Sequence, residues 1–373
     1  MLHRSEEAKL SLVRSLANRA GRAASKSHKK NIRTFIERFY ANIAPEDILN
    51  VPADDLLASA LSAWNYLQKR SPKKAQVRVF NPSSLAKSKS WPCPHTIVEI
   101  VNDDMPFLVD SVTAALNEMN LTIHIVIHPV INVRRDKDEQ LTGLFDDQAA
   151  QEDVNAESVM HVEINEQTLP ETLQEIQETL ETVLKDVRAA VSDWRDMRVK
   201  VADVIAELDA SPVPLPRADL DEAKSFLRWV EDNHFTFLGY REYSFSTTGQ
   251  NAQLRIEPKT GLGILRSTET TVFEGLQDRA ELPPDITDFI RKPSVLMVSK
   301  ANTRSTIHRP IHLDTIGIKK FDQRGQVVGE RLFTGLFTSD VYNQAVKEIP
   351  VLRRKVDTIV SDAGFHPNSH NGK

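Results

Sequence analysis

Residues His95–Arg134 read HTIVEIVNDDMPFLVDSVTAALNEMNLTIHIVIHPVINVR, and this stretch decides the fold of the first half of the chain. Thr96–Val101 is apolar and rich in β-branched residues, which predicts a strand. Residues at three- and four-residue steps then form one face of a predicted helix: Leu108, Val112, Ala115, Leu116 and Met119. Asn120 is the expected C-cap, and alternation from Leu121 to His128 predicts a second strand with its four aliphatic residues on one face.

The polar turn between the first strand and the helix is the predicted effector-binding site. It comprises Asn102, Asp103, Asp104, Met105, Pro106 and Phe107. Free N–H groups at a helix start attract a carboxylate, while Asp103 and Asp104 suit the ammonium group of a free amino acid. The alternative, which the residues alone favour, is that both aspartates only cap the helix.

The composition predicts a cytoplasmic protein of about two or three domains. The chain has 373 residues, 40% of them hydrophobic, and a mean hydropathy of −0.36. Its sequence contains no run near the roughly 20 apolar residues that span a bilayer, and its first residues lack the apolar core of a secretory signal. The net charge of −5 gives no reason to expect nucleic acid as a partner.

Cysteine and histidine give little indication of a metal site. Cys93 is the only cysteine, which excludes an internal disulfide and a multi-cysteine metal site, and we expect it to be an inert loop residue. His124 and His128 lie roughly 13 Å apart on a strand that rises about 3.3 Å per residue, so one ion cannot bind both. His161 could pair with one of them, but polar positions on an outer sheet face are favoured, and no metal site is predicted.

Residues 1–90 are predicted to be a helical segment with a basic start. Its first part carries Arg14, Arg19, Arg22, Lys26, Lys29, Lys30 and Arg33. A nucleic-acid or membrane-surface arm and a solvated helical face both fit these charges, and the lack of interleaved aromatic residues favours the solvated face. The expected buried positions are Leu10, Val13, Leu16 and Ala17 in the first helix, and Leu57, Leu61, Trp64 and Gln68 in a helix from Pro52. Gln76–Phe80 alternates like an edge strand, and Asn81–Pro94 reads as a linker.

After the central stretch, residues 134–157 are polar and predict a hairpin excursion, and Ser158–Ile164 alternates like a third strand. A long helix follows, with a seam formed by Leu173, Ile176, Leu180, Val183, Leu184, Val187, Val191 and Trp194. Three prolines within Ser211–Pro216 predict a domain boundary.

The second half predicts an aromatic-rich sheet flanked by helices. Asp219 begins a helix, with Glu222 placed for a capping box. The predicted strands are Phe235–Phe245, Gln253–Glu257, Val295–Ser299, Ile311–Phe321 and Gln326–Phe337, with turns at Thr247–Asn251 and Asp322–Gly325 and short helices within Gly261–Lys292. Ser339 is expected to cap one closing helix that carries Val346, Ile349, Leu352 and Val356.

Several motifs together resemble the N-terminal regulatory region of the large bacterial NAD-specific glutamate dehydrogenases. They are NDDMPFLVDSV, IHPV, FLRWVEDNHFTFLGYREY, STIHRPIHLDTIGIKKF and GERLFTGLFTSDVY, in this order along the chain. The resemblance implies an α+β fold in which a ferredoxin-like ACT module precedes a PAS-like antiparallel-sheet module. It implies residues 1–90 as a helical segment, 91–210 as the ACT-like domain with its long helix, 217–345 as the PAS-like domain, and 346–373 as a C-terminal helix and linker.

Two departures from the ACT pattern matter. The fourth ACT strand is missing after the long helix, and either Gln76–Phe80 or a partner module would have to supply it. Amino-acid-binding ACT domains carry Asp-x-Pro-Gly at the ligand turn, where this chain has Asp104-Met105-Pro106-Phe107. The glycine allows close approach of a ligand to the backbone, so the resemblance supports the fold more than the amino-acid site.

The resemblance implies a non-catalytic segment of a longer enzyme that converts glutamate and NAD to 2-oxoglutarate, ammonia and NADH. No G-x-G-x-x-G follows a predicted strand, Gly261-Leu262-Gly263 is too short, and we predict no catalytic residue and no cofactor in this segment, with NAD bound elsewhere in the parent. His308 and His312 are expected to form a structural or interface cluster. The expected partners are a downstream catalytic domain, further copies of the chain and an amino-acid effector, with no nucleic acid and no membrane. The alternative is a free-standing ACT/PAS sensor; the polar ending SDAGFHPNSHNGK, just after a helix, favours a segment.

Overall fold

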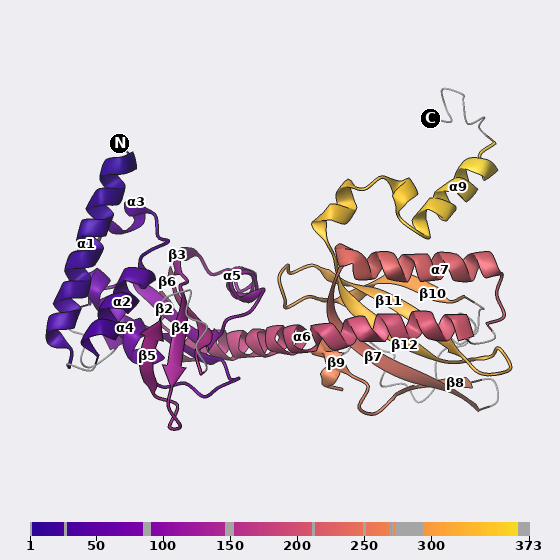
Figure 1. The fold of residues 1–373 in the computed structure, drawn as a ribbon, viewed down its shortest axis with the longest axis horizontal. Coiled ribbons are helices and arrows are strands. Elements are labelled where there is room, and N and C mark those ends of the chain that lie inside the picture. The colour runs from indigo at the N-terminus through magenta and orange to yellow at the C-terminus, as the bar shows by residue number, and fades with distance from the viewer. Residues whose placement is uncertain are drawn as a thin grey trace. The chain divides into compact units, whose positions relative to one another are not determined.

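The computed structural model shows an α+β protein with two antiparallel sheets (Figure 1). It describes residues 2–25, 28–84, 91–145, 153–210, 213–248, 251–268, 270, 272 and 294–364. Packing divides the chain into two compact units, residues 1–185 with 306–309, and residues 186–305 with 310–373. The predicted α+β class is therefore confirmed, whereas the predicted four-part division stays a prediction.

The sheet of the first unit has the strand order β1-β2-β6-β4-β5, and β3 also pairs with β6. Its strands are β1 (Gln76–Phe80), β2 (His95–Asp103), β3 (Ile123–Ile127), β4 (Val130–Arg135), β5 (Leu141–Phe145) and β6 (Asn155–Asn165). The helix α5 (Leu108–Glu118) joins β2 to β3, and Asn120 follows it with a left-handed φ of 59°. The predicted strand–helix–strand unit is thus confirmed. The β4–β5 hairpin begins before the predicted polar excursion of residues 134–157, which contains the end of β4 and all of β5.

The edge strand β1 takes the place of the missing fourth ACT strand. It pairs antiparallel with β2, from Gln76 opposite Val101 to Phe80 opposite Ile97. Since β6 lies on the other side of β2, the sheet has the neighbours expected of a ferredoxin-like plan. The edge strand is therefore Gln76–Phe80 of the chain itself and not a strand from a partner module. It precedes β2 in the sequence, whereas the ACT strand follows the last helix.

Four helices cover one face of this sheet. They are α1 (Leu2–Ala23), α2 (Lys29–Phe39), α3 (Pro45–Ile48) and α4 (Ala53–Leu67). Their apolar residues share one core with Val101, Ile127 and Val159 of the sheet. A short 3-10 turn (Pro82–Ser84) follows β1, within the predicted linker.

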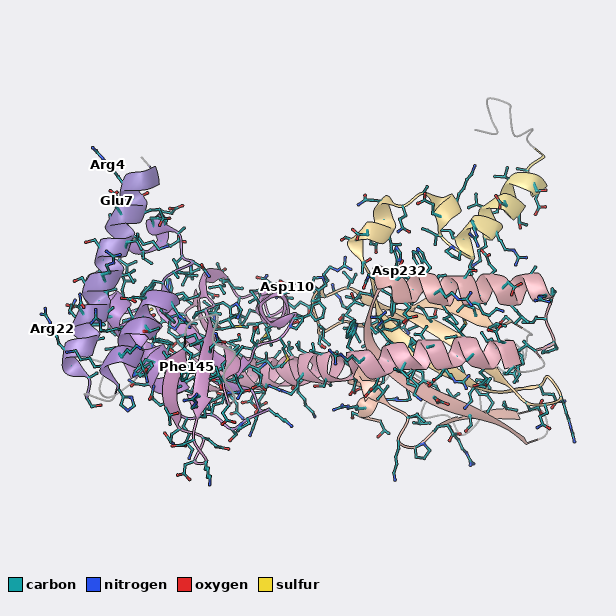
Figure 2. All side chains as sticks on the ribbon, in the orientation of Figure 1. Arg4, Glu7, Arg22, Asp110, Phe145 and Asp232 are labelled. Carbon is teal, nitrogen blue, oxygen red and sulfur yellow. The ribbon has the colours of Figure 1, made fainter. Side chains whose placement is uncertain are left out.

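Two predicted buried faces in these helices are partly wrong. Leu10 is 51% exposed, while Val13, Leu16 and Ala17 are buried as expected. In α4 the buried face is rotated toward Leu56, Ser59, Ala60, Ala63, Trp64 and Leu67. The α4 helix packs on β2 and β6, and this tertiary contact selects which of its two apolar edges becomes buried. The arginines of α1 (Arg4, Arg14, Arg19 and Arg22) stay exposed, and Figure 2 shows Arg4 and Arg22 extending outward from the helix. Lys9 is instead buried and donates to the carbonyl of Ala41 (2.8 Å).

The helix α6 (Pro170–Ala210) contains the boundary between the two units. Its predicted seam is confirmed from Ile176 to Val187, but Trp194 is 41% exposed. The buried position is instead Asp193, which accepts hydrogen bonds from the backbone N–H of Gly263 (2.7 Å) and from Arg266 (Nε, 2.5 Å). The carboxylate of Asp193, with its two hydrogen-bond donors, is thus buried where Trp194 was expected. Hydrophobic periodicity does not predict this, because it treats an aspartate as a surface residue.

The sheet of the second unit has the order β10-β11-β12-β7-β8, with β9 paired to β7. Its strands are β7 (Phe235–Thr248), β8 (Asn251–Ile256), β9 (Leu262–Gly263), β10 (Leu296–Arg304), β11 (His312–Phe321) and β12 (Val327–Phe337). The helices α7 (Arg217–Trp229) and the second half of α6 share one core with this sheet, so both sides of Ser211–Pro216 contribute to it. Short elements complete the unit: η2 (Val230–His234) and η3 (Ile264–Arg266).

The predicted strands of this unit are confirmed, and Asp322–Gly325 forms the hairpin turn, with the N–H of Gly325 bonded to the carbonyl of Asp322 (3.0 Å). The short helices predicted within Gly261–Lys292 fall largely outside the described residues, as do residues 249–250 of the Thr247–Asn251 turn.

Two helix ends differ from prediction. Pro216 is the N-cap of α7, and Glu222 instead accepts hydrogen bonds from the backbone of Val351 (2.7 Å) and from Arg353 (Nε, 2.8 Å). The single closing helix is replaced by η4 (Ser339–Asn343), η5 (Val346–Glu348) and α9 (Leu352–Asp362), and the Ser339 side chain caps none of them. Pro350 interrupts the predicted helix because it cannot donate a helical hydrogen bond.

Candidate functional site

A buried polar cluster lies between the first sheet and the helices α1–α4. Glu99 of β2 pairs with His161 of β6, and Ile97 pairs with Glu163. Because side chains alternate along a strand, Glu99, His161 and Glu163 share the sheet face whose apolar residues contact the helices. The expectation that His161 lies on an outer sheet face is therefore wrong, because the N-terminal helices cover that face.

His161 is the centre of the cluster and is 0% exposed. Its Nδ1 lies 3.3 Å from Glu99 Oε1, and its Nε2 lies 3.0 Å from Ser59 Oγ and 3.6 Å from Glu163 Oε1. Burial disfavours the imidazolium, but the hydrogen bonds and charges of Glu163 and Glu99 outweigh burial and raise the pKa of His161 to about 9. His161 is thus a buried cation held between two carboxylates.

The carboxylate of Glu99 is held by a second cation. Arg78 of β1 donates from Nε to Glu99 Oε2 (2.8 Å), and its guanidinium lies over the ring of Tyr66, 4.3 Å from the centroid. Burial alone raises the pKa of Glu99, but the contacts with His161 and Arg78 lower it below its ordinary value. The edge strand β1 therefore contributes charge as well as backbone pairing.

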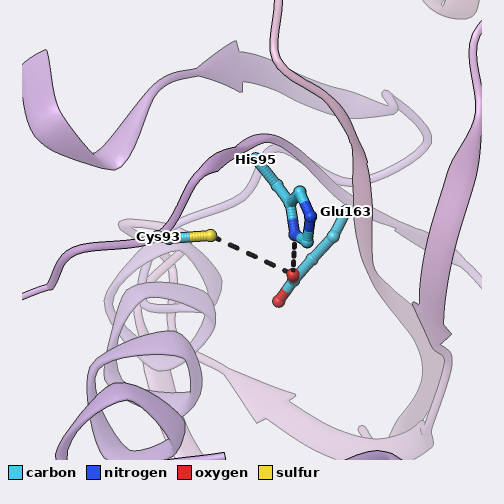
Figure 3. Close-up of side chains that lie close together, drawn as sticks. All are labelled: Cys93, His95 and Glu163. Atoms are coloured by element: carbon cyan, nitrogen blue, oxygen red, sulfur yellow. Dashed lines mark hydrogen bonds and ion pairs between the residues drawn. The ribbon is translucent and has the colours of Figure 1, made fainter.

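Cys93, His95 and Glu163 lie at the rim of this cluster (Figure 3). His95 Nδ1 is 2.7 Å from Glu163 Oε2, and Cys93 Sγ is 4.0 Å from the same oxygen. Burial raises the pKa of the Cys93 thiol to about 11, so the thiol is protonated at neutral pH. The ring of His124 stacks on that of His95, with centroids 4.1 Å apart.

A β-bulge places His124 there. Ile123 pairs with Ile164 and Ile125 pairs with Glu163, so β3 has one extra residue between two neighbours of β6. Bulges re-aim side chains, and this one puts Ile123 and Ile125 on opposite faces of the sheet. The prediction that the four aliphatic residues of this strand share one face is therefore wrong at the bulge.

A cavity of about 360 Å³ opens beside the rim. Its lining includes Tyr40, Asp55, Ser59, Trp91, Cys93, His95, His124 and Glu163. The walls come from the chain between α2 and α4, from α4 itself, from the segment that leads into β2, and from β3 and β6. The arrangement offers the carboxylates of Asp55 and Glu163, two imidazoles and a thiol to a small ligand or a cation.

The predicted effector turn lies away from this cavity lining, and most of its polar groups have protein partners. Asp103 forms an ion pair with the buried Arg70, which also donates from Nε to Glu157 (3.1 Å). Arg135 donates to the same Glu157 from Nε (2.8 Å). Asp104 is exposed. Neither aspartate caps α5, because its N-cap is Phe107 without a side-chain hydrogen bond.

Phe107 adopts a left-handed φ of 72° at the position where the ACT pattern has glycine. Its ring centroid lies 5.4 Å from that of His308. His308 also donates its backbone N–H to Ser111 Oγ (2.9 Å), and its Nδ1 lies 2.8 Å from Asp110 Oδ2. His312 instead contacts the carbonyl of Ala301 (3.1 Å), so the expected His308–His312 cluster does not form.

The sequence alone did not predict that Glu99 and Glu163 are part of a site, or that Cys93 and His95 lie beside Glu163. The available signal was the presence of two acidic residues inside apolar predicted strands, since charged residues are seldom buried unless paired. His124 and His128 have different partners: the ring of His124 stacks on His95, whereas Nε2 of His128 is 2.6 Å from Ser158 Oγ.

Comparison with known proteins identifies the first unit. The glutamate dehydrogenase ACT1 domain matches residues 35–180, and helical motif 1 of glutamate dehydrogenase matches residues 349–373. Residues 35–180 are therefore similar to the ACT1 domain of glutamate dehydrogenases. The matched residues include the end of α2, all of α3 and α4, and every strand of the first sheet, while α1, outside the match, shares the same core.

The relatives are NAD-specific glutamate dehydrogenases. The one from Halomonas elongata is 35% identical over 375 residues, which is 100% of this chain and 23% of the relative. The one from Pseudomonas aeruginosa is 33% identical over 92% of this chain and 21% of the relative, and the one from Mycobacterium tuberculosis is 24% identical over 74% and 16%. The predicted resemblance to an N-terminal segment of these enzymes is confirmed, and the chain spans less than a quarter of their length. Within the described residues, no helix combines the length and the apolar character needed to cross a membrane.

Proposed function

We propose that the chain is the regulatory and assembly segment of an NAD-dependent glutamate dehydrogenase. The match over 100% of the chain but 23% of a relative carries the proposal, together with the ACT1 domain at residues 35–180. In this proposal the parent enzyme converts glutamate and NAD to 2-oxoglutarate, ammonia and NADH in the cytoplasm, and its catalytic domain binds NAD. The segment contacts that domain and further copies of itself, and takes no part in hydride transfer.

We also propose that the second unit is a PAS-like module. The strand order β8-β7-β12-β11-β10 supports this, because the first two strands in sequence lie together and the last three return beside them. The aromatic core between Phe235, Phe237 and Phe333 provides the apolar interior that such a module needs.

A free amino acid is the proposed effector, with its site at residues 102–107. The two aspartates of the turn differ in their surroundings: Asp103 forms an ion pair with Arg70, whereas Asp104 is exposed. Asp104 is therefore the carboxylate that would contact the effector's ammonium group, and the effector's carboxylate would face the start of α5. Removing such a charge-assisted contact costs about 1.5–3 kcal/mol, roughly ten- to more than a hundredfold in affinity.

The test has two parts. Residues 1–373 alone should not reduce NAD with glutamate, whereas a longer protein that includes them should do so; turnover by the purified segment above the level of a mock preparation would refute the non-catalytic role. Calorimetry with a panel of amino acids on the wild type, Asp104→Asn and Asp103→Asn then tests the site. Binding that Asp104→Asn leaves unchanged would place the effector elsewhere.

A further inference from the structure

The rim of the buried cluster brings together three kinds of metal ligand. Cys93 Sγ, one ring nitrogen of His95 and one carboxylate oxygen of Glu163 all lie within 4.8 Å of one another. Thiolate, imidazole and carboxylate are the ligands that zinc takes in proteins. We propose that Cys93, His95 and Glu163 form a zinc-binding site, with the fourth position open to the cavity beside them.

The distances require only small movements. A tetrahedral zinc ion with bonds of about 2.0–2.3 Å holds its ligand atoms roughly 3.4–3.6 Å apart. The nitrogen of His95 and the oxygen of Glu163 are now 2.7 Å apart, and the sulfur of Cys93 is 4.0 Å from that oxygen. Shifts below about 1 Å therefore convert the hydrogen-bonded cluster into a coordination shell. Zinc takes the place of the hydrogen bond between His95 Nδ1 and Glu163, so the neutral ring then carries its proton on Nε2, and the thiol proton of Cys93 is released to solvent.

The backbone fixes two of the three ligands. His95 begins β2 and Glu163 lies near the end of β6, in strands paired from His95 opposite Asn165 onward. Sites on strands are held more accurately than sites on loops. Cys93 lies two residues before β2, between Pro92 and Pro94, whose rings restrict the backbone on both sides of the thiol.

The surroundings supply the supporting contacts that metal sites need. His161 lies behind Glu163, with Nε2 3.6 Å from Oε1, and Glu99 and Ser59 hold His161 in turn. On the open side, the ring of His124 stacks on His95 at the bulge of β3. The cavity of about 360 Å³ leaves space for a water ligand.

The experiment uses the tag-free 373-residue chain, stripped with a chelator and titrated with zinc by calorimetry. We expect one high-affinity ion per chain, and a loss of affinity on the order of 100-fold or more in Cys93→Ala and His95→Gln, since loss of a supporting contact alone costs about 10–100-fold. His128→Gln is the matched control, because His128 is a half-buried histidine that directly follows β3 and lies outside the cluster, and this variant should bind like the wild type.

Cobalt provides a second measurement that a structural role of Cys93 would not affect. Cobalt bound to the wild type should show a thiolate-to-metal charge-transfer band, which Cys93→Ala should lose while keeping its circular dichroism spectrum. Absence of stoichiometric zinc binding would overturn the proposal. So would equal zinc affinity in the wild type and in folded Cys93→Ala, because the ion would then be held by other side chains.

Discussion

Glu330 should make the second unit less stable as the pH rises through neutrality. This residue lies on β12, opposite Lys319 of β11 and Tyr243 of β7. The residue keeps part of its surface exposed, but its Oε1 atom is fully covered and has no hydrogen-bond partner among the described residues. Burial of this carboxyl end, only partly offset by the charge of Lys319, raises the pKa of Glu330 to about 7.

The direction follows from linkage. A carboxyl group whose pKa is higher in the folded than in the unfolded state stabilises the fold fully below its unfolded pKa of 4.5. That stabilisation is lost as the pH rises through about 7. The difference in pKa corresponds to about 3 kcal/mol at roughly 1.4 kcal/mol per pH unit, an upper limit because the side chain retains some contact with water.

Glu330→Gln should therefore raise the free energy of unfolding of the second unit by up to about 3 kcal/mol at pH 8 and leave it unchanged at pH 4. Urea unfolding followed by fluorine NMR of labelled tryptophan separates the signals of Trp194 and Trp229, in the second unit, from those of Trp64 and Trp91 in the first. A difference of this size moves the urea midpoint by about 1 M or more.

Glu242→Gln is the matched control on the neighbouring strand β7. Burial favours the neutral form of Glu242, but its contacts with Lys320 (2.7 Å) and Tyr240 lower its pKa below the ordinary value. Its stabilisation is present above pH 4.5 and lost as the pH falls, so this variant should be destabilised at pH 8. Equal effects of the two substitutions at pH 8, or a wild-type stability that rises between pH 5 and 8, would refute the reasoning.

Three further results are expected. Arg70→Ala should lower the free energy of unfolding of the first unit by about 3 kcal/mol or more, because it leaves a buried carboxylate with one cation fewer, whereas Arg19→Ala, at an exposed ion pair, should cost less than about 1 kcal/mol in the same urea assay. Gly263→Ala should destabilise the second unit far more than Gly364→Ala, since both have positive φ but only at Gly263 would Cβ lie 2.1 Å from a backbone oxygen; thermal unfolding of the two variants compares them. Cleavage at residues 213–216 should leave two fragments that co-elute in gel filtration, because the core of the second unit has side chains from both sides of the cut, and separate elution would contradict this.

Local periodicity predicted the elements of the first unit well. The spacing of apolar residues changes from three- and four-residue steps in α5 to alternation in β3, and this change predicted both elements. The alternation of apolar and polar residues around His161 predicted β6. It could not predict the bulge, since one inserted residue changes the face of every later side chain without changing the sequence pattern.

The buried cluster could not be predicted from the sequence, because its members are distant along the chain. Glu99 and His161 are 62 positions apart, and only strand pairing makes them neighbours. Whether their face is covered depends on helices more than 30 residues upstream in the chain. Glu222 shows the same limit in the second unit, because the local capping pattern was outcompeted by Arg353, a partner 131 positions away.

The position of β1 ahead of β2 has a consequence for the order of folding during synthesis. In a ferredoxin-like fold whose edge strand follows the last helix, the sheet cannot be completed until that helix and the strand after it have been synthesised. Here every strand of the first sheet lies within residues 76–165, and the covering helices α1–α4 come earlier still. Since domains fold as units while the chain lengthens, this sheet and its polar cluster can close before α6 is made. If translation is stalled near residue 200, the residues of the first sheet should therefore already be protected from protease in the nascent chain.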